Sequence, residues 1–284
     1  MSDQALTQFS TEDIRETRPE MKIGLLATIT PEGLPHVTMI SSLMACGPDQ
    51  ICFGQFTEGR CKENILTHPK TGFLVMSLNK EMWRGKASYT HLSKEGPEYD
   101  YYNNVPMFRY NAYFGVHTVY YMDLVSHTGK HPLPMGRVIF AAVQTMIART
   151  LGRKLGQKQV LNGWTRAFLD KLDNLKFLSY IGEDGYPLII PAIQAQSLDG
   201  EHVIFSASIY GDELEQIPPG AELCVFDMAL TMEDVLLRGK YLGMRRVGGI
   251  KSGLVKVNWV YNPMPPVPGQ IYPPVELAPV EDFS

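Results

Sequence analysis

The chain has 284 residues, of which 44% are hydrophobic and 20% charged, and its formal net charge is −4. This composition is typical of a soluble globular protein, and the length allows two domains of ordinary size. A net negative charge argues against bulk binding to nucleic acids or anionic membranes, which need a basic surface. We therefore expect neither nucleic acid nor a membrane as a partner.

The sequence shows no membrane-spanning segment, no secretory signal and no metal-binding cysteine motif. No stretch reaches the roughly 18–20 apolar residues that cross a bilayer, and the first residues are too polar and acidic for a secretory signal. The four cysteines show no metal-ligand spacing. We therefore expect reduced thiols, no bound metal and a cytoplasmic location.

The first half of the chain reads as short strands separated by Gly and Pro turns. After a capped helix near residues 10–16, the predicted strands are 22–29, 36–43, 51–56, 71–78, 83–92 and 115–125. A short helix is expected at 60–67 and a tyrosine-rich helical insertion near 98–103. About six short strands with such turns are typical of a small barrel.

The second half repeats this pattern after a helical stretch. Helical periodicity covers 136–151 and 159–172. The following strands are predicted at 176–181, 188–197, 202–208, 221–228, 235–245 and 253–261. The proline-dense end, 262–279, is expected to form an extended arm.

An internal repeat indicates a duplicated domain. The apolar run, acidic-Gly turn and second apolar run at 25–37 recur at 177–189, an offset of 177 − 25 = 152. The Arg-Gly-Lys run at 84–86 returns at 238–240, an offset of 238 − 84 = 154. The repeat predicts a first domain at 1–131, a helical connector at 132–172, a second domain at 173–262 and a Pro-rich arm at 263–284.

One segment of the first copy suits a phosphate. A strand leads into a helix whose start carries Thr57, Arg60 and Lys62. Free backbone N–H groups, the positive end of the helix dipole and two cations together favour an anion. On these residues alone, a solvated first turn whose cations face water is the slightly favoured interpretation.

Three segments resemble the pyridoxamine 5′-phosphate oxidase-like, FMN-binding split β-barrel family. They are the hairpin at 25–37, the strand and helix at 51–69, and Arg-Gly-Lys-Ala at 84–87. The resemblance implies a mainly β fold with helices: two tandem six-stranded antiparallel split barrels joined by the helical connector. It also implies FMN as the cofactor.

Carried over to this sequence, the resemblance assigns a role to each residue of the candidate site. Thr57 and Arg60 would hold the FMN phosphate, and Asn64 would stand at the family's helix Asn. The isoalloxazine ring would face Thr38, Met39, Ile40, Ser41, Gln55 and Phe56. The family's Lys position falls on Cys61, so Lys62 would serve only if its long side chain bends back.

The second copy departs from this pattern. Its equivalent stretch, 206–217, has no Arg or Lys and carries Asp212, Glu213 and Glu215. We expect it to have lost its phosphate site, because carboxylates repel a phosphate. In the family the flavin lies between two barrels. The resemblance therefore implies an internal pseudo-dimer in which copy two walls the site of copy one, with homo-oligomerisation left open.

Two functions follow from the resemblance. The first is an FMN-dependent oxidoreductase that passes electrons or hydride to a small organic acceptor, the expected small-molecule substrate. The second is a non-catalytic flavin- or haem-binding carrier or sensor. Since the flavin performs the redox step, no catalytic side chain is named.

Some signals leave alternatives open. His117 could ligate haem or be a polar-face strand histidine, and His127 and His131 fit exposed loop positions better than metal ligands. The helix at 138–148 could lie on a membrane, although packing between the barrels is favoured. A group of tyrosines could cover a ring-shaped ligand or pack over a barrel mouth: Tyr99, Tyr101, Tyr102, Tyr110 and Tyr113.

Overall fold

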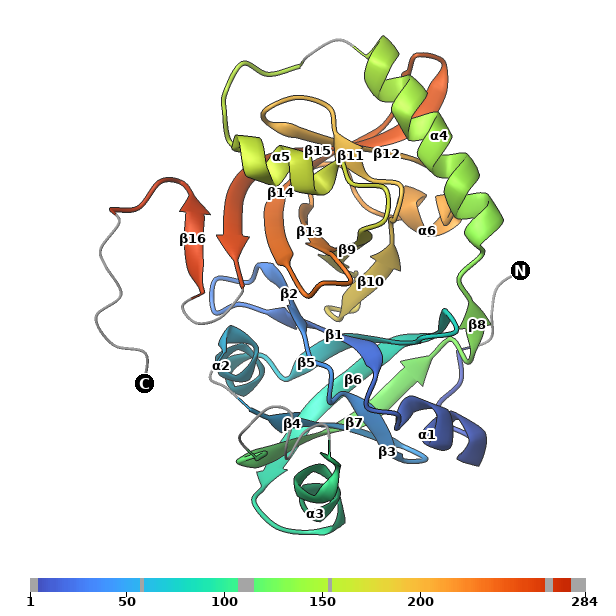
Figure 1. Cartoon of the computed structure of the whole chain (residues 1–284), viewed down its shortest axis with the longest axis vertical. Helices are drawn as coiled ribbons and strands as arrows, with labels where there is room; N and C mark the ends of the chain where they lie inside the picture. The colour runs from blue at the N-terminus through green and yellow to red at the C-terminus, as the bar shows by residue number, and fades with distance from the viewer. Residues whose placement is uncertain (1–4, 57–58, 107–114, 153–154, 264–267, 277–284) are drawn as a thin grey trace. The chain divides into compact units, whose positions relative to one another are not determined.

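The structure is a computed structural model that describes residues 5–56, 59–106, 115–152, 155–263 and 268–276 (Figure 1). The chain divides into two compact units. One comprises residues 1–133 with 181–189, and the other comprises 134–180 with 190–284.

The first unit is built on one antiparallel sheet. Its strands are β1 (Lys22–Ile29), β2 (Pro35–Met39), β3 (Met44–Gly47), β4 (Gln50–Gln55), β5 (Lys70–Ser77), β6 (Glu81–Ser93), β7 (Thr118–His127) and β8 (His131–Pro132). They follow the order β2-β1-β5-β6-β7-β4-β3, with β8 paired to β6. The helices are α1 (Thr11–Thr17), α2 (Arg60–Thr67) and α3 (Pro97–Asn104).

The second unit has a sheet of the same order, β10-β9-β13-β14-β15-β12-β11, with β16 paired to β15. The strands are β9 (Leu175–Ile181), β10 (Pro187–Pro191), β11 (Gln196–Ser197), β12 (His202–Ser206), β13 (Glu222–Met228), β14 (Asp234–Val247), β15 (Ile250–Asn262) and β16 (Gly269–Tyr272). The helices are α4 (Met135–Leu151), α5 (Gly163–Leu169) and α6 (Gly211–Glu215).

The predicted fold class, mainly β with helices, is confirmed, but each sheet has eight strands rather than six. The difference lies in short strands that local patterning does not reveal, such as β3 and β11. The predicted strand at 36–43 ends early because the Leu43 amide turns back to the Ile40 carbonyl, which starts β3 as a separate strand.

The strand-pairing registers of the two sheets show the duplication more clearly than the sequence does. Gly72 pairs with Lys86 and Cys224 with Arg238, so both partners keep the offset of 152 (224 − 72 and 238 − 86). The register shifts directly after Lys86 in one sheet and directly after Arg238 in the other. The Arg-Gly-Lys match at an offset of 154 is therefore two residues out of structural register.

The helical periodicity between the repeats corresponds to α4 and α5. Helix α4 packs against β12 of the second unit (Figure 1). Its Thr145 hydroxyl donates to the Ala141 carbonyl and accepts the Ser206 amide at 2.9 Å. These bonds satisfy a buried hydroxyl on the face of α4 that lies on the sheet.

Part of the predicted extended arm is instead a strand. In β16, Gln270 pairs with Tyr261 of β15, and its side-chain oxygen accepts the Trp259 indole N–H at 2.9 Å. A Gly-Gln-Ile-Tyr run between prolines is too short to identify from its pattern, and the edge of β15 provides its partner. Of the remaining arm, residues 268 and 273–276 have no helix or strand, and 264–267 and 277–284 lie outside the described residues.

Candidate functional site

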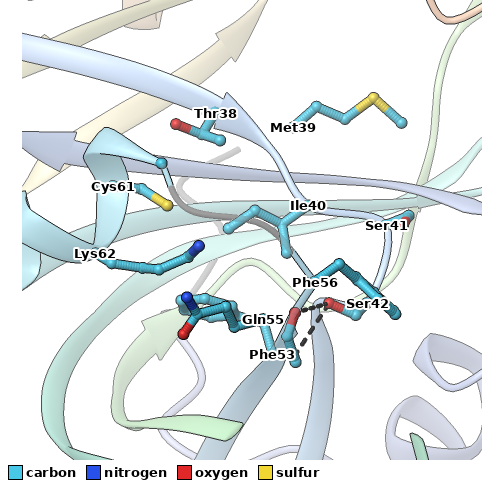
Figure 2. Close-up of a pocket in the computed structure, with 12 residues that line it drawn as sticks. Thr38, Met39, Ile40, Ser41, Ser42, Phe53, Gln55, Phe56, Cys61 and Lys62 are labelled. Carbon is cyan, nitrogen blue, oxygen red and sulfur yellow. Dashed lines mark hydrogen bonds between the residues drawn. The ribbon is translucent and has the colours of Figure 1, made fainter. Parts of the chain in front are cut away.

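A pocket opens in the first unit where β2 and β4 end and α2 begins (Figure 2). Its volume is about 130 Å³. Most of the residues that the resemblance assigned to the cofactor line it: Thr38, Met39, Ile40, Ser41, Gln55, Phe56, Cys61 and Lys62. Sequence reasoning missed four further lining residues: Ser42, Phe53, Gly54 and Gly59.

Three predicted site residues are placed differently. Thr57 lies outside the described residues. Arg60 is exposed and is not among the residues that line the pocket. Asn64 is buried and donates its amide to the Thr28 hydroxyl at 2.9 Å, so in this structure it attaches α2 to β1.

Lys62 is the cationic side chain among the described lining residues, and only 8% of it is exposed. Figure 2 shows it reaching from α2 toward Gln55. The displacement by one helical position therefore does not keep this side chain out of the pocket. A lysine whose stem is buried and whose ammonium reaches a pocket with a few polar groups is suited to an anionic ligand.

The neighbouring Cys61 is buried, and burial raises the pKa of its thiol, although the Lys62 charge and the Thr38 hydroxyl act in the opposite direction. The thiol form is therefore favoured at neutral pH. Since the thiolate is the nucleophile, Cys61 is suited to forming part of the pocket wall rather than to covalent chemistry.

The start of α2 adds backbone donors to the site. Gly59 is the N-cap residue and supplies no side-chain cap. The first-turn N–H groups of a helix lack intrahelical acceptors, and the helix dipole makes that end attractive to anions. Lys62 lies within the same first turn, so both sources of positive potential act on one end of the pocket.

The hydroxyl groups of two tyrosines donate hydrogen bonds to residues that line the pocket. The Tyr102 hydroxyl donates to the Ser42 carbonyl at 2.6 Å, and Ser42 in turn exchanges hydrogen bonds with the backbone of Gly54. The Tyr120 hydroxyl donates to the side-chain oxygen of Gln55 at 3.1 Å. These bonds hold the β4 end in one position relative to the segment after β2.

The tyrosine-rich insertion mostly packs rather than presenting a ring surface to the pocket. Tyr102 is fully buried in a cluster with Met44, Cys52, Val116 and Val119. Tyr99 and Tyr101 pack on the edge of that cluster. Tyr110 and Tyr113 lie outside the described residues.

Among its described residues, the second unit has no cationic helix start comparable to that of α2. The helix at the position of α2 is α6, which has five residues and carries Asp212 and Glu213 in its first turn. At the offset of 152, Glu213 and Leu214 stand where the first unit has Cys61 and Lys62. Glu215 is paired with Lys251 of β15.

The prediction that His127 is an exposed loop residue is wrong. His127 ends β7 and is buried, with one ring nitrogen bonded to the Gln8 carbonyl and the other accepting the Gly129 amide. An N-terminal segment far away in sequence covers it, which no local pattern reveals. His117 is exposed, and the described residues contain no cluster of potential metal ligands.

No protein-family model matches the sequence, and no curated protein matches it either. Several solved structures are similar to it. An FMN-binding protein from Syntrophomonas wolfei subsp. wolfei is 17% identical, with 43% of this chain and 88% of that chain covered and a TM-score of 0.36. An F420 reductase is 15% identical, with 42% and 98% covered and a TM-score of 0.34.

The styrene monooxygenase flavin reductase from Pseudomonas putida S12 is 12% identical, with 39% of this chain and 81% of that chain covered and a TM-score of 0.27. Each similarity spans about two-fifths of the present chain. The chain is thus similar to FMN-binding and pyridoxamine 5′-phosphate oxidase-like split-barrel proteins. Within the described residues, no helix is both long and apolar enough to cross a membrane.

Proposed function

We propose that the first unit binds FMN and that the protein is an oxidoreductase passing electrons or hydride to a small organic acceptor. The observation that carries this proposal is the Lys62 ammonium in the pocket, next to the start of α2. A phosphate carries nearly two negative charges and favours charge-assisted hydrogen bonds from such donors.

The remaining lining residues fit a polar heterocycle. Thr38 and Ser41 offer hydroxyl groups, Gln55 offers an amide held by Tyr120, and Met39, Ile40 and Phe56 offer apolar surface. Ligand sites combine a mostly apolar wall with a few placed polar groups in this way. When bound, the flavin supplies the electron and hydride transfer, and these side chains bind and orient it.

The size of the pocket limits what it encloses. Its volume of about 130 Å³ is smaller than the roughly 300–1,000 Å³ of sites that surround a whole ligand. The lining residues therefore enclose one part of the cofactor.

Titration with FMN and with riboflavin, followed by fluorescence quenching, tests the assignment of Lys62. Lys62→Met should weaken FMN binding about tenfold to a hundredfold, because a charge-assisted bond is lost. Riboflavin has no phosphate, so its affinity should stay nearly unchanged. Lys94→Met removes an exposed lysine that is not a lining residue and serves as the matched control.

Equal losses for both ligands would mean that Lys62 does not meet the phosphate. An absorbance spectrum of the purified protein tests the cofactor itself: flavin bands are expected, whereas a Soret band would identify haem. If flavin is bound but a reductant and small acceptors give no turnover, the carrier or sensor alternative replaces the oxidoreductase.

A further inference from the structure

Helix α4 has two apolar faces, and only one of them is covered. Val138, Ala141, Thr145 and Ala148 are buried on the second unit. The other face exposes large apolar side chains over an arc of about 160° at 100° per residue. These are Met135, Ile139, Phe140, Val143, Met146, Ile147 and Leu151.

This exposure is large for a folded protein. Ile139 and Phe140 are 61% and 60% exposed, and Leu151 is 62% exposed. Single exposed apolar residues are ordinary, but a contiguous apolar surface marks an interaction site. The packing of α4 on its own unit accounts for the buried face and leaves this outer face without a partner among the described residues.

The sequence segment that contains this helix has a charge opposite to that of the whole protein. No Asp or Glu occurs from residue 124 to residue 169, although the protein is negative overall. The same stretch contains Lys130, Arg137, Arg149, Arg153, Lys154, Lys158 and Arg166. Two of these cations already have carboxylate partners, because Lys130 is paired with Glu16 and Arg149 with Asp170. A sequence this depleted of carboxylates is complementary to a negatively charged surface.

A cavity of about 300 Å³ continues the apolar face at its C-terminal end. Leu151 belongs to both, and Leu155, Leu198, Val247 and Leu254 complete the apolar lining. Arg245 and Arg246 are exposed at the same cavity, and Arg246 is braced by donating to the Gly249 carbonyl at 3.1 Å. An apolar hollow with two arginines fits an amphipathic anion.

We propose that the outer face of α4 and this cavity bind the surface of a bilayer that contains anionic phospholipid. Amphipathic helices with apolar residues on one side and cations beside them lie in the interface of such membranes. A second copy of the chain fits less well. A symmetric contact through this face would set its cations against the same cations, with no carboxylate in the segment to pair them.

Sedimentation of the full-length protein with lipid vesicles tests the proposal. The protein should sediment with phosphatidylcholine vesicles that contain about one-third phosphatidylserine, should bind much less to pure phosphatidylcholine, and should be released by high salt. Arg245→Ala with Arg246→Ala should lower the partition coefficient roughly tenfold or more. Phe140→Gln with Ile147→Gln should lower it by at least about tenfold.

Leu230→Gln changes a leucine that is 74% exposed elsewhere in the second unit, and it should leave binding unchanged. Circular dichroism of each variant confirms that it is folded. Absence of binding to the anionic vesicles overturns the proposal. So does a dimer in sedimentation velocity that Phe140→Gln with Ile147→Gln abolishes, because the face would then join two copies of the chain.

Discussion

At the scale of single residues, the position of a cation relative to the pocket decides its expected contribution. Lys62 is buried at the pocket wall, whereas Arg60 is exposed outside the lining residues. Charge pairs that are largely in water contribute little, because solvent and salt screen them. The family pattern favours Arg60 and the structure favours Lys62.

Arg60→Ala separates these two expectations. From its exposure, we expect this change to weaken FMN binding by less than about tenfold, and by less than Lys62→Met does. Fluorescence titration of both variants at one salt concentration gives the comparison. If Arg60→Ala lowers the FMN affinity tenfold to a hundredfold and Lys62→Met has little effect, then Arg60 binds the phosphate, as the family pattern predicts.

A buried carboxyl in the second unit should make stability depend on pH. Burial raises the pKa of Asp234 to about 7, and one of its oxygens has no partner among the described residues. The folded state then binds more protons than the unfolded state between about pH 4 and pH 7. Stability is present at the acidic end of this window and is lost as the pH rises toward 7.

Asp234→Asn should remove this contribution. We compare the free energies of unfolding of the variant and of the unmodified protein. The difference, variant minus unmodified protein, should rise by on the order of 2 kcal/mol from pH 5 to pH 8. Urea denaturation at both pH values measures the gain, and Asp123→Asn, at an exposed carboxylate, is the control. A constant difference between variant and parent across this range would show that Asp234 stays ionised in the folded state.

At the scale of elements, helix α3 is part of the architecture of the pocket. It belongs to an insertion that lengthens the first copy relative to the second. Its Tyr102 is fully buried, and the hydroxyl supports the Ser42 carbonyl at the pocket floor. The element therefore links the inserted segment to the end of β4, because Ser42 is bonded to Gly54.

Tyr102→Phe tests the contribution of the hydrogen bond from the Tyr102 hydroxyl to the Ser42 carbonyl. Loss of the hydroxyl leaves a buried carbonyl without that donor and should cost about 1–3 kcal/mol in free energy of unfolding. Tyr101→Phe removes an exposed hydroxyl that donates to the Arg18 carbonyl, and it should cost less than about 0.5 kcal/mol. Chemical denaturation measures both variants. Equal losses would mean that the buried hydrogen bond contributes nothing beyond an exposed one.

At the scale of the whole molecule, two copies share a topology but not a site. Seven strands of the second sheet follow the order of the first, with each strand number raised by eight; the eighth differs, since β8 pairs with β6 and β16 with β15. Only the first copy places a lysine at the start of its α2-type helix, and the second places Asp212 and Glu213 there. The two copies therefore share the sheet, but the side-chain charge at the helix start is positive in the first copy and negative in the second.

This asymmetry predicts one FMN per chain. A like charge at about 4 Å costs on the order of 1 kcal/mol in water and more where water is partly excluded. Several such repulsions, together with the missing cation, should make the second site at least about a thousandfold weaker. Extraction and quantitation of flavin from saturated protein measures the ratio, and a value near two would show that the second copy also binds.

Local sequence determined the repeated hairpins of this protein. Gly33 and Gly185 follow acidic residues in matching turns and have φ of 77° and 78°, a region that glycine enters without steric cost. Because the turn residues and the alternation of the flanking strands are local properties, they predicted the fold class and the duplication. The same applies to the pocket, since most of its lining residues come from two strand ends and one helix start.

Only the tertiary structure decided which side chains are covered and how the strands are aligned. His127 is buried because a distant N-terminal segment contacts it, and Lys62 enters the pocket because α2 packs on β1 with that face inward. The bulge after Arg238 matches this residue with Lys86 rather than Arg84. Contacts between segments that are remote in sequence determine the burial of His127, the placement of Lys62 and the register at Arg238. A periodic pattern shows which face of a segment is apolar, but it does not identify the segment that covers this face.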